Sequence, residues 1–137
     1  MSLRFTRLSW PRAAVALCVA CCFCASYDAQ GHARVVKAQP ADKSELTTSP
    51  HQIELWFNEL LDEGFNSVEV FSARDLRAKL RTNFAGGEPK VDAKDRTHLS
   101  IPLKMLPAGE YVVEWRVLSR DGHSAPGRLT FRVSGPK

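Results

Sequence analysis

The most regular pattern in the chain is the stretch EYVVEWRVLS, at positions 110–119. Four bulky residues recur in it at every second position: Tyr111, Val113, Trp115 and Val117. A period of two puts alternate side chains on one face of an extended strand. Valine, tyrosine and tryptophan also favour strands over other structures. The stretch therefore predicts a long β-strand with one face in a hydrophobic core.

Six shorter segments share this character and are separated by turn signals such as Pro40-Ala41-Asp42. Seven strands in a domain of about 100 residues are typical of two packed antiparallel sheets with Greek-key connections. The predicted fold class is therefore all-β, a seven-stranded Greek-key β-sandwich of the immunoglobulin-like or cupredoxin-like barrel type. A competing helical signal at 58–65 predicts at most one turn. Besides 110–119, we expect strands at 33–39, 52–57, 67–72, 78–84, 98–103 and 128–133.

The amino-terminal segment has the composition of a secretory signal peptide. An uncharged apolar run at 13–25 is followed by the small residues of Ala29-Gln30-Gly31, which fit a cleavage site. The run is shorter than the roughly 20 residues that a transmembrane helix needs. We interpret residues 1–31 as a cleaved signal peptide and residues 32–137 as the mature domain. Three basic residues precede the apolar run: Arg4, Arg7 and Arg12.

Cleavage at this point changes both the cysteine count and the charge of the chain. The mature domain would contain no thiol, because all four cysteines lie in the removed segment. Loss of three arginines and Asp28 lowers the formal net charge from +4 to +2. No run of five or six like charges remains, which argues against binding to nucleic acid or to an anionic membrane. A retained membrane anchor, or lipid attachment at Cys21 or Cys24, is the alternative interpretation.

Cleavage after Gly31 would expose His32 as the first residue of the mature chain. An amino-terminal histidine offers a metal two nitrogens, the free α-amine and the ring Nδ1, which close a chelate together. Tetragonal sets of nitrogen and oxygen ligands favour Cu(II). The α-amine exists only after processing, so a different cleavage site would remove this interpretation.

The tripeptide Asp121-Gly122-His123 follows the strongest predicted strand. Residues i and i+2 of an extended chain project from one face, so the carboxylate of Asp121 and the imidazole of His123 can act together. Gly122 between them permits a tight backbone. The same tripeptide is common in plain turns, and by itself it leaves a purely structural role open.

The other candidate ligands have weaker support. His51 and His98 belong to no motif, and we expect both at the surface. Met105 is the single methionine of residues 32–137 and lies among leucines, which predicts a core position. Cu(I) prefers several soft sulfur ligands. If the domain binds copper, we therefore expect Cu(II).

Five motifs follow one another in order along the mature domain: His32-Ala33, Gln39-Pro40-Ala41-Asp42, Leu55-Trp56-Phe57-Asn58-Glu59, Leu106-Pro107-Ala108-Gly109-Glu110-Tyr111 and Val113-Glu114-Trp115-Arg116-Val117-Leu118-Ser119. Asp121-Gly122-His123 follows them, and the most specific part is the run Tyr-Val-x-x-Trp-Arg-x-x-Ser-x-Asp-Gly-His at 111–123. In this order the motifs resemble the CopC family of periplasmic copper-resistance proteins, and the resemblance covers nearly all of residues 32–137. We therefore expect a CopC-like copper-binding domain there.

The resemblance implies a site that holds one Cu(II) per chain at the mature amino terminus. The amine and ring of His32 would bind the metal, and Asp121 and His123 would complete the equatorial ligands. Glu59 matches a glutamate that lies close to the site in some family members, and we keep it as a candidate neighbour of the metal. The methionine-rich Cu(I) site of some members has no counterpart, because residues 71–89 contain neither methionine nor histidine.

The expected function is Cu(II) binding in the periplasm for copper tolerance, homeostasis or delivery, without enzymatic activity. The resemblance implies an inner-membrane CopD-type copper transporter as a partner. We expect a monomer that is not membrane-embedded and does not bind nucleic acid. Two other classes remain open at this point. One is a copper-dependent oxidative enzyme of the amino-terminal-histidine type, and the other is a metal-free immunoglobulin-like interaction module.

Overall fold

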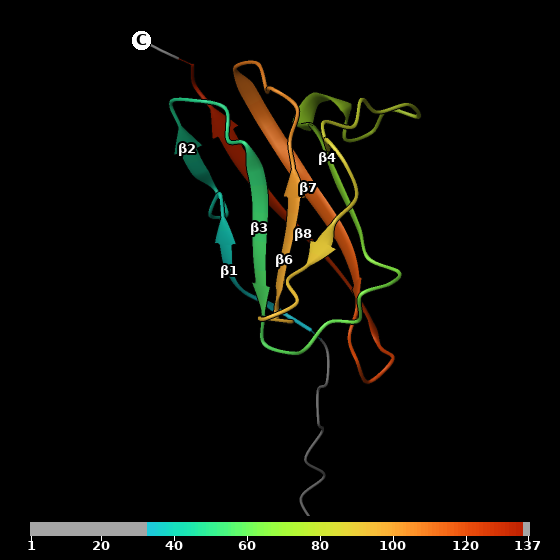
Figure 1. The fold of residues 1–137 in the computed structure, drawn as a ribbon. Coiled ribbons are helices and arrows are strands. Elements are labelled where there is room, and N and C mark those ends of the chain that lie inside the picture. The colour runs from blue at the N-terminus through green and yellow to red at the C-terminus, as the bar shows by residue number, and fades with distance from the viewer. Residues whose placement is uncertain (1–32, 136–137) are drawn as a thin grey trace, which may run out of the picture. The chain divides into compact units, whose positions relative to one another are not determined.

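The computed structural model describes residues 33–135, which form two four-stranded β-sheets packed face to face (Figure 1). One 3₁₀ turn, η2 at Ala73–Asp75, follows the fourth strand. The predicted all-β sandwich is confirmed, with one strand more than the seven expected. The eight strands of this region are β1 Val35–Gln39, β2 Ser44–Leu46, β3 Gln52–Phe57, β4 Ser67–Ser72, β5 Lys90–Val91, β6 His98–Pro102, β7 Gly109–Leu118 and β8 Ser124–Val133.

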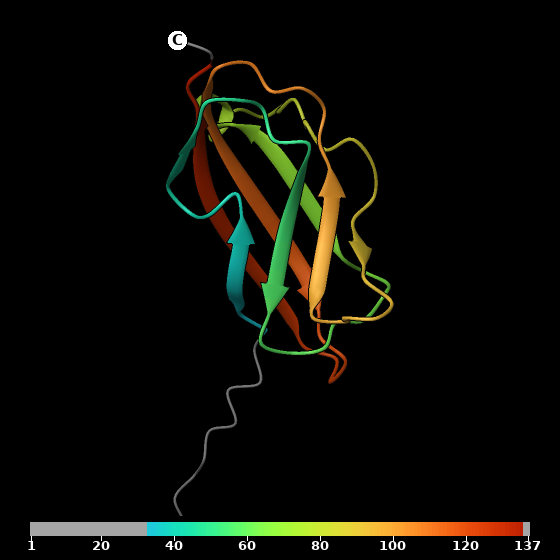
Figure 2. The ribbon, with the colours of Figure 1, turned by 60° about the vertical axis from the view of Figure 1, so that its left-hand side comes forward.

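The first sheet has the strand order β1-β3-β6-β5 and the second the order β2-β8-β7-β4, as the two layers of Figure 2 show. The pairs are antiparallel except that β2 runs parallel to β8, with Ser44 opposite Phe131. The consecutive strands β1 and β2 belong to different sheets, so the chain changes layers between them. The sequence prediction of purely antiparallel sheets was therefore wrong for the pair of β2 and β8. Residues 44–46 are too few to show an alternating pattern.

The core lies between the two sheets and follows the alternation predicted for 110–119. On β7, Tyr111, Val113 and Val117 are at most 3% exposed. Burial of each such side chain contributes roughly 1.5–3 kcal/mol to folding. The other buried side chains of this core come from β3 and β6 of the opposite sheet and from β8, the neighbour of β7: Ile53, Leu55, Phe57, Leu99, Ile101, Leu129 and Phe131.

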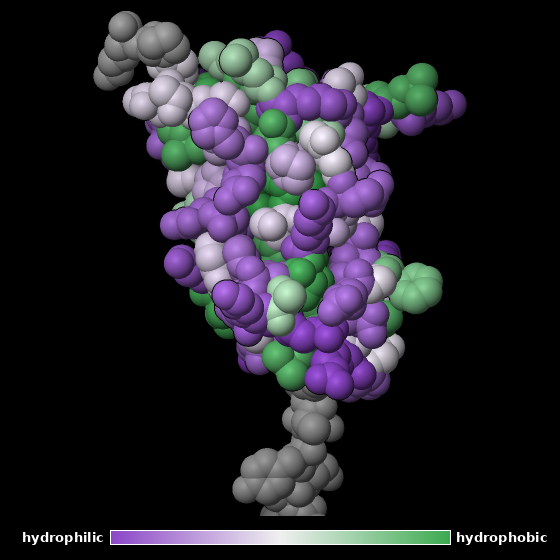
Figure 3. All heavy atoms as spheres, in the orientation of Figure 1, coloured by the Kyte–Doolittle hydropathy of each residue, from purple (hydrophilic) through white to green (hydrophobic). Residues whose placement is uncertain are grey.

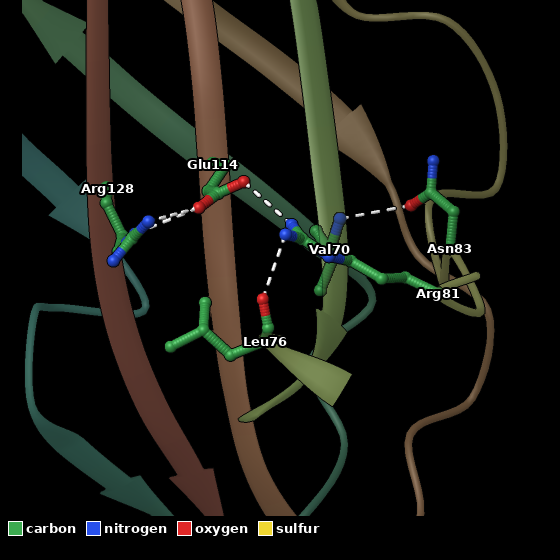
Figure 4. A network of polar contacts seen from close by, with 6 residues as sticks. All are labelled: Val70, Leu76, Arg81, Asn83, Glu114 and Arg128. Carbon is green, nitrogen blue, oxygen red and sulfur yellow. Dashed lines mark hydrogen bonds and ion pairs between the residues drawn. The ribbon is translucent and has the colours of Figure 1, made fainter. Parts of the chain in front are cut away.

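The prediction of a strand at 78–84 is wrong, because these residues follow β4 and η2 without forming a strand. The side-chain oxygen of Asn83 accepts the N–H of Val70 at 3.0 Å, as Figure 4 shows. The N–H of Phe84 in turn donates to the carbonyl of Val70 at 2.7 Å. A side-chain amide thus replaces the strand that would otherwise pair with the edge of β4, one of the ways in which proteins protect exposed strand edges.

Arg81 explains why an outward-facing aromatic residue of β4 is buried. Its guanidinium carbon lies 4.4 Å from the ring centre of Phe71, which is only 1% exposed. Its Nη1 lies 3.1 Å from Oε2 of Glu114 on β7, and Glu114 also pairs with Arg128 on β8 (Figure 4). Residues 81–84 therefore lie against the second sheet and are bonded to it at several points.

Gly127 on β8 allows the indole of Trp115 to lie across the neighbouring strand. The two residues are directly opposite one another in the β7–β8 pair. A Cβ atom added at Gly127 would overlap the six-membered ring of Trp115. The same indole packs edge-on against Phe57, with 6.4 Å between ring centres, and so links the two sheets.

We therefore predict that Gly127→Ala destabilises the fold by about 1–3 kcal/mol, the usual cost of overpacking a well-packed interior. Urea unfolding followed by tryptophan fluorescence measures the change in the free energy of unfolding. Gly64→Ala is the matched control, because a Cβ there meets its nearest atom at 3.6 Å. We expect that variant to stay within about 0.5 kcal/mol of the parent chain. Equal stability of the two variants would contradict the packing argument.

Candidate metal centre

The start of the described chain is fastened to the connection between β3 and β4. The N–H of Arg34 donates to the side-chain oxygen of Asn58 at 2.5 Å, and the N–H of Asn58 donates back to the carbonyl of Arg34 at 3.0 Å. Ala33, which precedes Arg34, is 6% exposed and belongs to the core cluster. Burial and reciprocal hydrogen bonds therefore fix the direction in which the chain enters β1.

The same connection is fastened on its other side to the end of β7. The N–H of Arg120 donates to the carbonyl of Leu60 at 3.0 Å, and Leu61 forms an isolated β-bridge with Ser119. Both Leu61 and Ser119 are almost fully buried. Figures 1 and 2 both show the start of β1, the β3–β4 connection and the β7–β8 turn together at one end of the sandwich.

Arg96, which precedes β6, also forms hydrogen bonds with this connection. Its carbonyl accepts the N–H of Leu61 at 2.9 Å, and its Nη2 donates to the carbonyl of Leu61 at 2.8 Å. Its Nη1 lies 3.3 Å from Oε1 of Glu63. Residues 58–63 are therefore held by three parts of the chain that are far apart in sequence, and the end of the sandwich is well ordered by its hydrogen bonds.

Asp121 is the centre of the turn between β7 and β8. Its Oδ1 accepts hydrogen bonds from the hydroxyl of Ser119 and, at 3.1 Å, from the N–H of His123. Its Oδ2 lies 3.0 Å from Nδ1 of His123. Gly122 has a φ of +88°, a left-handed conformation that glycine adopts without strain. The predicted proximity of Asp121 and His123 is confirmed, and both side chains are exposed to solvent.

These hydrogen bonds lower the pKa of Asp121 to about 2, from 3.8 in the absence of interactions. The largest cause is the hydroxyl of Ser119, followed by the backbone N–H and then the side chain of His123. All three favour the ionised carboxylate. The turn thus presents a carboxylate that stays charged at any pH near neutrality, next to an imidazole.

Glu59 lies at the same end of the molecule. It lines a shallow surface hollow that Asp121 also lines, and the other lining residues are Asn58, Leu60, Thr97, Ser119 and Arg120. His32 lies outside the described residues. Within residues 33–135, no three side chains of His, Cys, Asp or Glu come together as a group able to hold a metal. Asp121 and His123 are therefore a pair of donors that would need further ligands from elsewhere.

Among the remaining candidates, His98 begins β6 directly after Thr97, at this end of the fold, but it interacts with other residues than Asp121 and His123. His98 on β6 stacks on Trp56 with 4.4 Å between ring centres, and its Nε2 lies 3.3 Å from Oε1 of Glu54. His51 is exposed, as expected, before β3. The core position predicted for Met105 was wrong, because Met105 is 86% exposed. The leucine whose side chain is buried in that stretch is its neighbour Leu106.

Sequence reasoning missed two residues that organise this region, Ser119 and Asn58. Each had a local signal that could have been used. A serine two residues before an aspartate, followed by glycine, is a pattern in which side chains bond to nearby groups in turns. An asparagine directly after a buried strand often replaces a backbone partner through its side chain. Neither pattern indicates which distant segment is bound, which only the fold reveals.

Comparison with known proteins identifies the family. The model of the CopC domain matches residues 35–134, and the chain therefore belongs to the CopC family. Copper resistance protein C of Pseudomonas syringae pv. tomato is 33% identical over 77% of this chain and 82% of that protein. Protein YobA of Escherichia coli K12 is 31% identical over 74% of this chain and 78% of its own length.

Copper transport protein CutJ of Bacillus subtilis is 32% identical over 74% of this chain, but the match covers only 18% of CutJ. This chain therefore corresponds to a small part of that longer protein.

Solved structures agree with this assignment. CopC from Methylosinus trichosporium OB3b has a TM-score of 0.68 and 26% identity over 77% of this chain and 97% of its own. PcoC of Escherichia coli, described as a methionine-rich copper resistance protein, has a TM-score of 0.62 and 27% identity over 75% of this chain and 99% of its own. Over residues 33–135 we find no helix with the length and apolar character needed to cross a membrane.

The geometry of the turn predicts that Ser119→Ala raises the pKa of Asp121 towards 3.8, because the largest cause of its lowering is removed. Carbon NMR titration of the aspartate carboxyl groups measures this pKa directly. The pKa of Asp92 is also lowered, but by the backbone N–H groups of Asp95 and Lys94, so it serves as an internal control. An unchanged Asp121 pKa in the variant would show that the hydroxyl has no such role.

The sign of the linkage follows from the direction of this shift. Because the folded-state pKa of Asp121 lies below its unfolded value, its contribution to stability is complete above about pH 4. It is lost as the pH falls through about 2. In Ser119→Ala this loss should begin at a higher pH.

Proposed function

We propose that the mature chain is a periplasmic protein that binds one Cu(II) ion through His32, Asp121 and His123, for copper tolerance, homeostasis or delivery. The observation that supports this most strongly is the hydrogen-bonded link from Arg34 through residues 58–61 to the turn that carries Asp121 and His123. The family and the copper-related names of the relatives support the choice of metal.

Covalent geometry supports a role for the residue before Ala33. Consecutive Cα atoms across a trans peptide bond are 3.8 Å apart. We therefore expect a ligand on that residue to act at the end of the sandwich where Arg34 is bonded to Asn58. After cleavage at the predicted site, the residue is an amino-terminal histidine with two nitrogen donors. A donor pair 89 positions further along the sequence would then be complemented by a chelate from the chain terminus.

The donors fit Cu(II) by their chemistry. Three nitrogens and one carboxylate oxygen form the tetragonal kind of set that Cu(II) prefers. Asp121 is already ionised, with a pKa of about 2, so no proton need leave it. Its Oδ2 lies beside Nδ1 of His123, which leaves Nε2 as the ring nitrogen able to bind a metal while that contact persists. Binding of the metal by Oδ2 itself would replace the contact.

The other proposed roles rest on the same site. Glu59 would remain close to the metal without binding it, and its carboxylate would offset part of the ion's charge. A CopD-type transporter of the inner membrane is the proposed recipient or donor of the copper. We expect the mature chain to act as a monomeric carrier without enzymatic activity. Copper is its cargo, held by exposed groups from which a partner protein can take it.

We predict that the mature chain binds one equivalent of Cu(II) and that an extra glycine before His32 lowers the affinity more than about 100-fold. The extension converts the amine to an amide, and loss of an outer partner of a metal ligand alone costs 10–100-fold. His123→Ala should have a comparable effect. Isothermal titration with a competing chelator measures the affinity, and mass spectrometry of the periplasmic protein establishes the first residue.

His51→Ala is the matched control for this titration, and it should retain Cu(II) within about threefold of the parent affinity. A titration with Cu(I) should show negligible binding, because Cu(I) prefers several soft sulfur ligands and residues 33–135 contain one methionine and no cysteine. Undiminished Cu(II) affinity in the extended protein would contradict the proposal. A mature mass that begins at a cysteine would contradict it as well.

A further inference from the structure

The segment between η2 and Asn83 projects from the sandwich, and it carries an exposed leucine near its tip. Leu80 is 92% exposed, more than any other large hydrophobic residue of the described chain. Figure 1 shows the segment standing out beyond the sheets at the upper right, and Figure 3 shows a hydrophobic group there among hydrophilic ones. Because the end of the segment is held by Asn83 and Arg81, the exposed tip is presented by an anchored loop.

Basic side chains surround this tip. Residues 74–81 contain four basic residues and one acid, Asp75. Arg81 is occupied by Glu114 and by the carbonyl of Leu76. The other three are exposed to solvent: Arg74, Arg77 and Lys79.

The fold brings a second basic and apolar pair to the base of the loop. The backbone N–H of Lys104 donates to the carbonyl of Phe84 at 2.9 Å, and its Nζ donates to the carbonyl of Asn83 at 3.2 Å. Met105, the next residue, is 86% exposed. The sequence contains no run of five or six like charges, which argued against an anionic membrane as a partner. The structure adds Lys104, from a separate segment, to the three exposed basic residues of the loop.

We propose that residues 74–81, together with Lys104 and Met105, form a docking surface for an anionic lipid bilayer. This surface is called the basic loop surface below. Exposed Lys and Arg side chains are attracted to anionic headgroups, each strengthening binding about fivefold close to the surface. An aliphatic side chain such as Leu80 can enter the boundary between headgroups and acyl chains. The combination of both on one projecting loop fits a lipid surface better than either feature would alone.

The other exposed apolar residues have a different setting. Phe65 is 88% exposed, but it follows Asp62 and Glu63 in the connection between β3 and β4. An anionic surface would repel that region. The basic loop surface and the candidate copper site also lie on different loops of the fold, so docking does not require any residue proposed to bind the metal.

Co-sedimentation with vesicles tests this proposal on the mature protein purified from the periplasm. We expect binding to vesicles of phosphatidylglycerol and phosphatidylcholine, and none to phosphatidylcholine alone. Binding should fall steeply between 0.1 and 0.5 M salt, because the Debye length falls from about 10 Å to a few Å. The double variant R77E/K79E should lower the partition coefficient more than about tenfold, and Leu80→Ser about fivefold.

Two matched variants separate the surface from general charge effects. K90E/K94E changes the net charge by the same amount at exposed positions on and beside β5, and Phe65→Ser removes an equally exposed aromatic residue. Both should bind vesicles nearly as well as the parent. Equal losses in R77E/K79E and K90E/K94E would overturn the proposal, because net charge alone would then explain the binding. Absence of binding to the anionic vesicles would overturn it outright.

Discussion

The hydrogen-bonded connection between β3 and β4 is the constraint on which the rest of the candidate site depends. Asn58 bonds in both directions with Arg34, and Leu60 and Leu61 bond to the segment that follows β7. The connection therefore joins the first strand of one sheet to the β7–β8 turn of the other sheet.

A sandwich is well suited to this arrangement, because its loops gather at two ends while its strands fill the core. Trp115 and Phe57 pack against each other between the sheets just inside the end that carries the candidate site. Gly127 makes room for the indole. The turn with its exposed groups therefore follows a well-packed part of the core. Within the turn, the hydroxyl of Ser119 and the N–H of His123 hold the Asp121 carboxylate in one orientation. Rigid support of a small polar group is what a specific metal ligand requires.

The sequence predicted the features that repeat along the chain better than those that occur once. Alternation identified β3, β4 and β7 and the core faces of these strands, and the Asp121-Gly122-His123 spacing identified the turn. Residues 78–84 were mistaken for a strand because Asn83 and Arg81 replace strand pairing with side-chain contacts, which no period reveals. Met105 was expected in the core because leucines flank it, but a loop has no alternation to fix which side chain points inward. Long-range contacts such as that between Asn58 and Arg34 depend on topology.

The proposed copper site lies at one end of the sandwich, and the line broadening caused by paramagnetic Cu(II) reports directly on the location of the ion. Amide NMR spectra of the mature protein, recorded with increasing fractions of one equivalent of Cu(II), should lose the signals of residues 33–34, 58–61 and 119–123 first. Signals near His51, Met105 and the basic loop surface should persist. Broadening centred on His51 or Met105, or spread evenly over the molecule, would contradict the central claim.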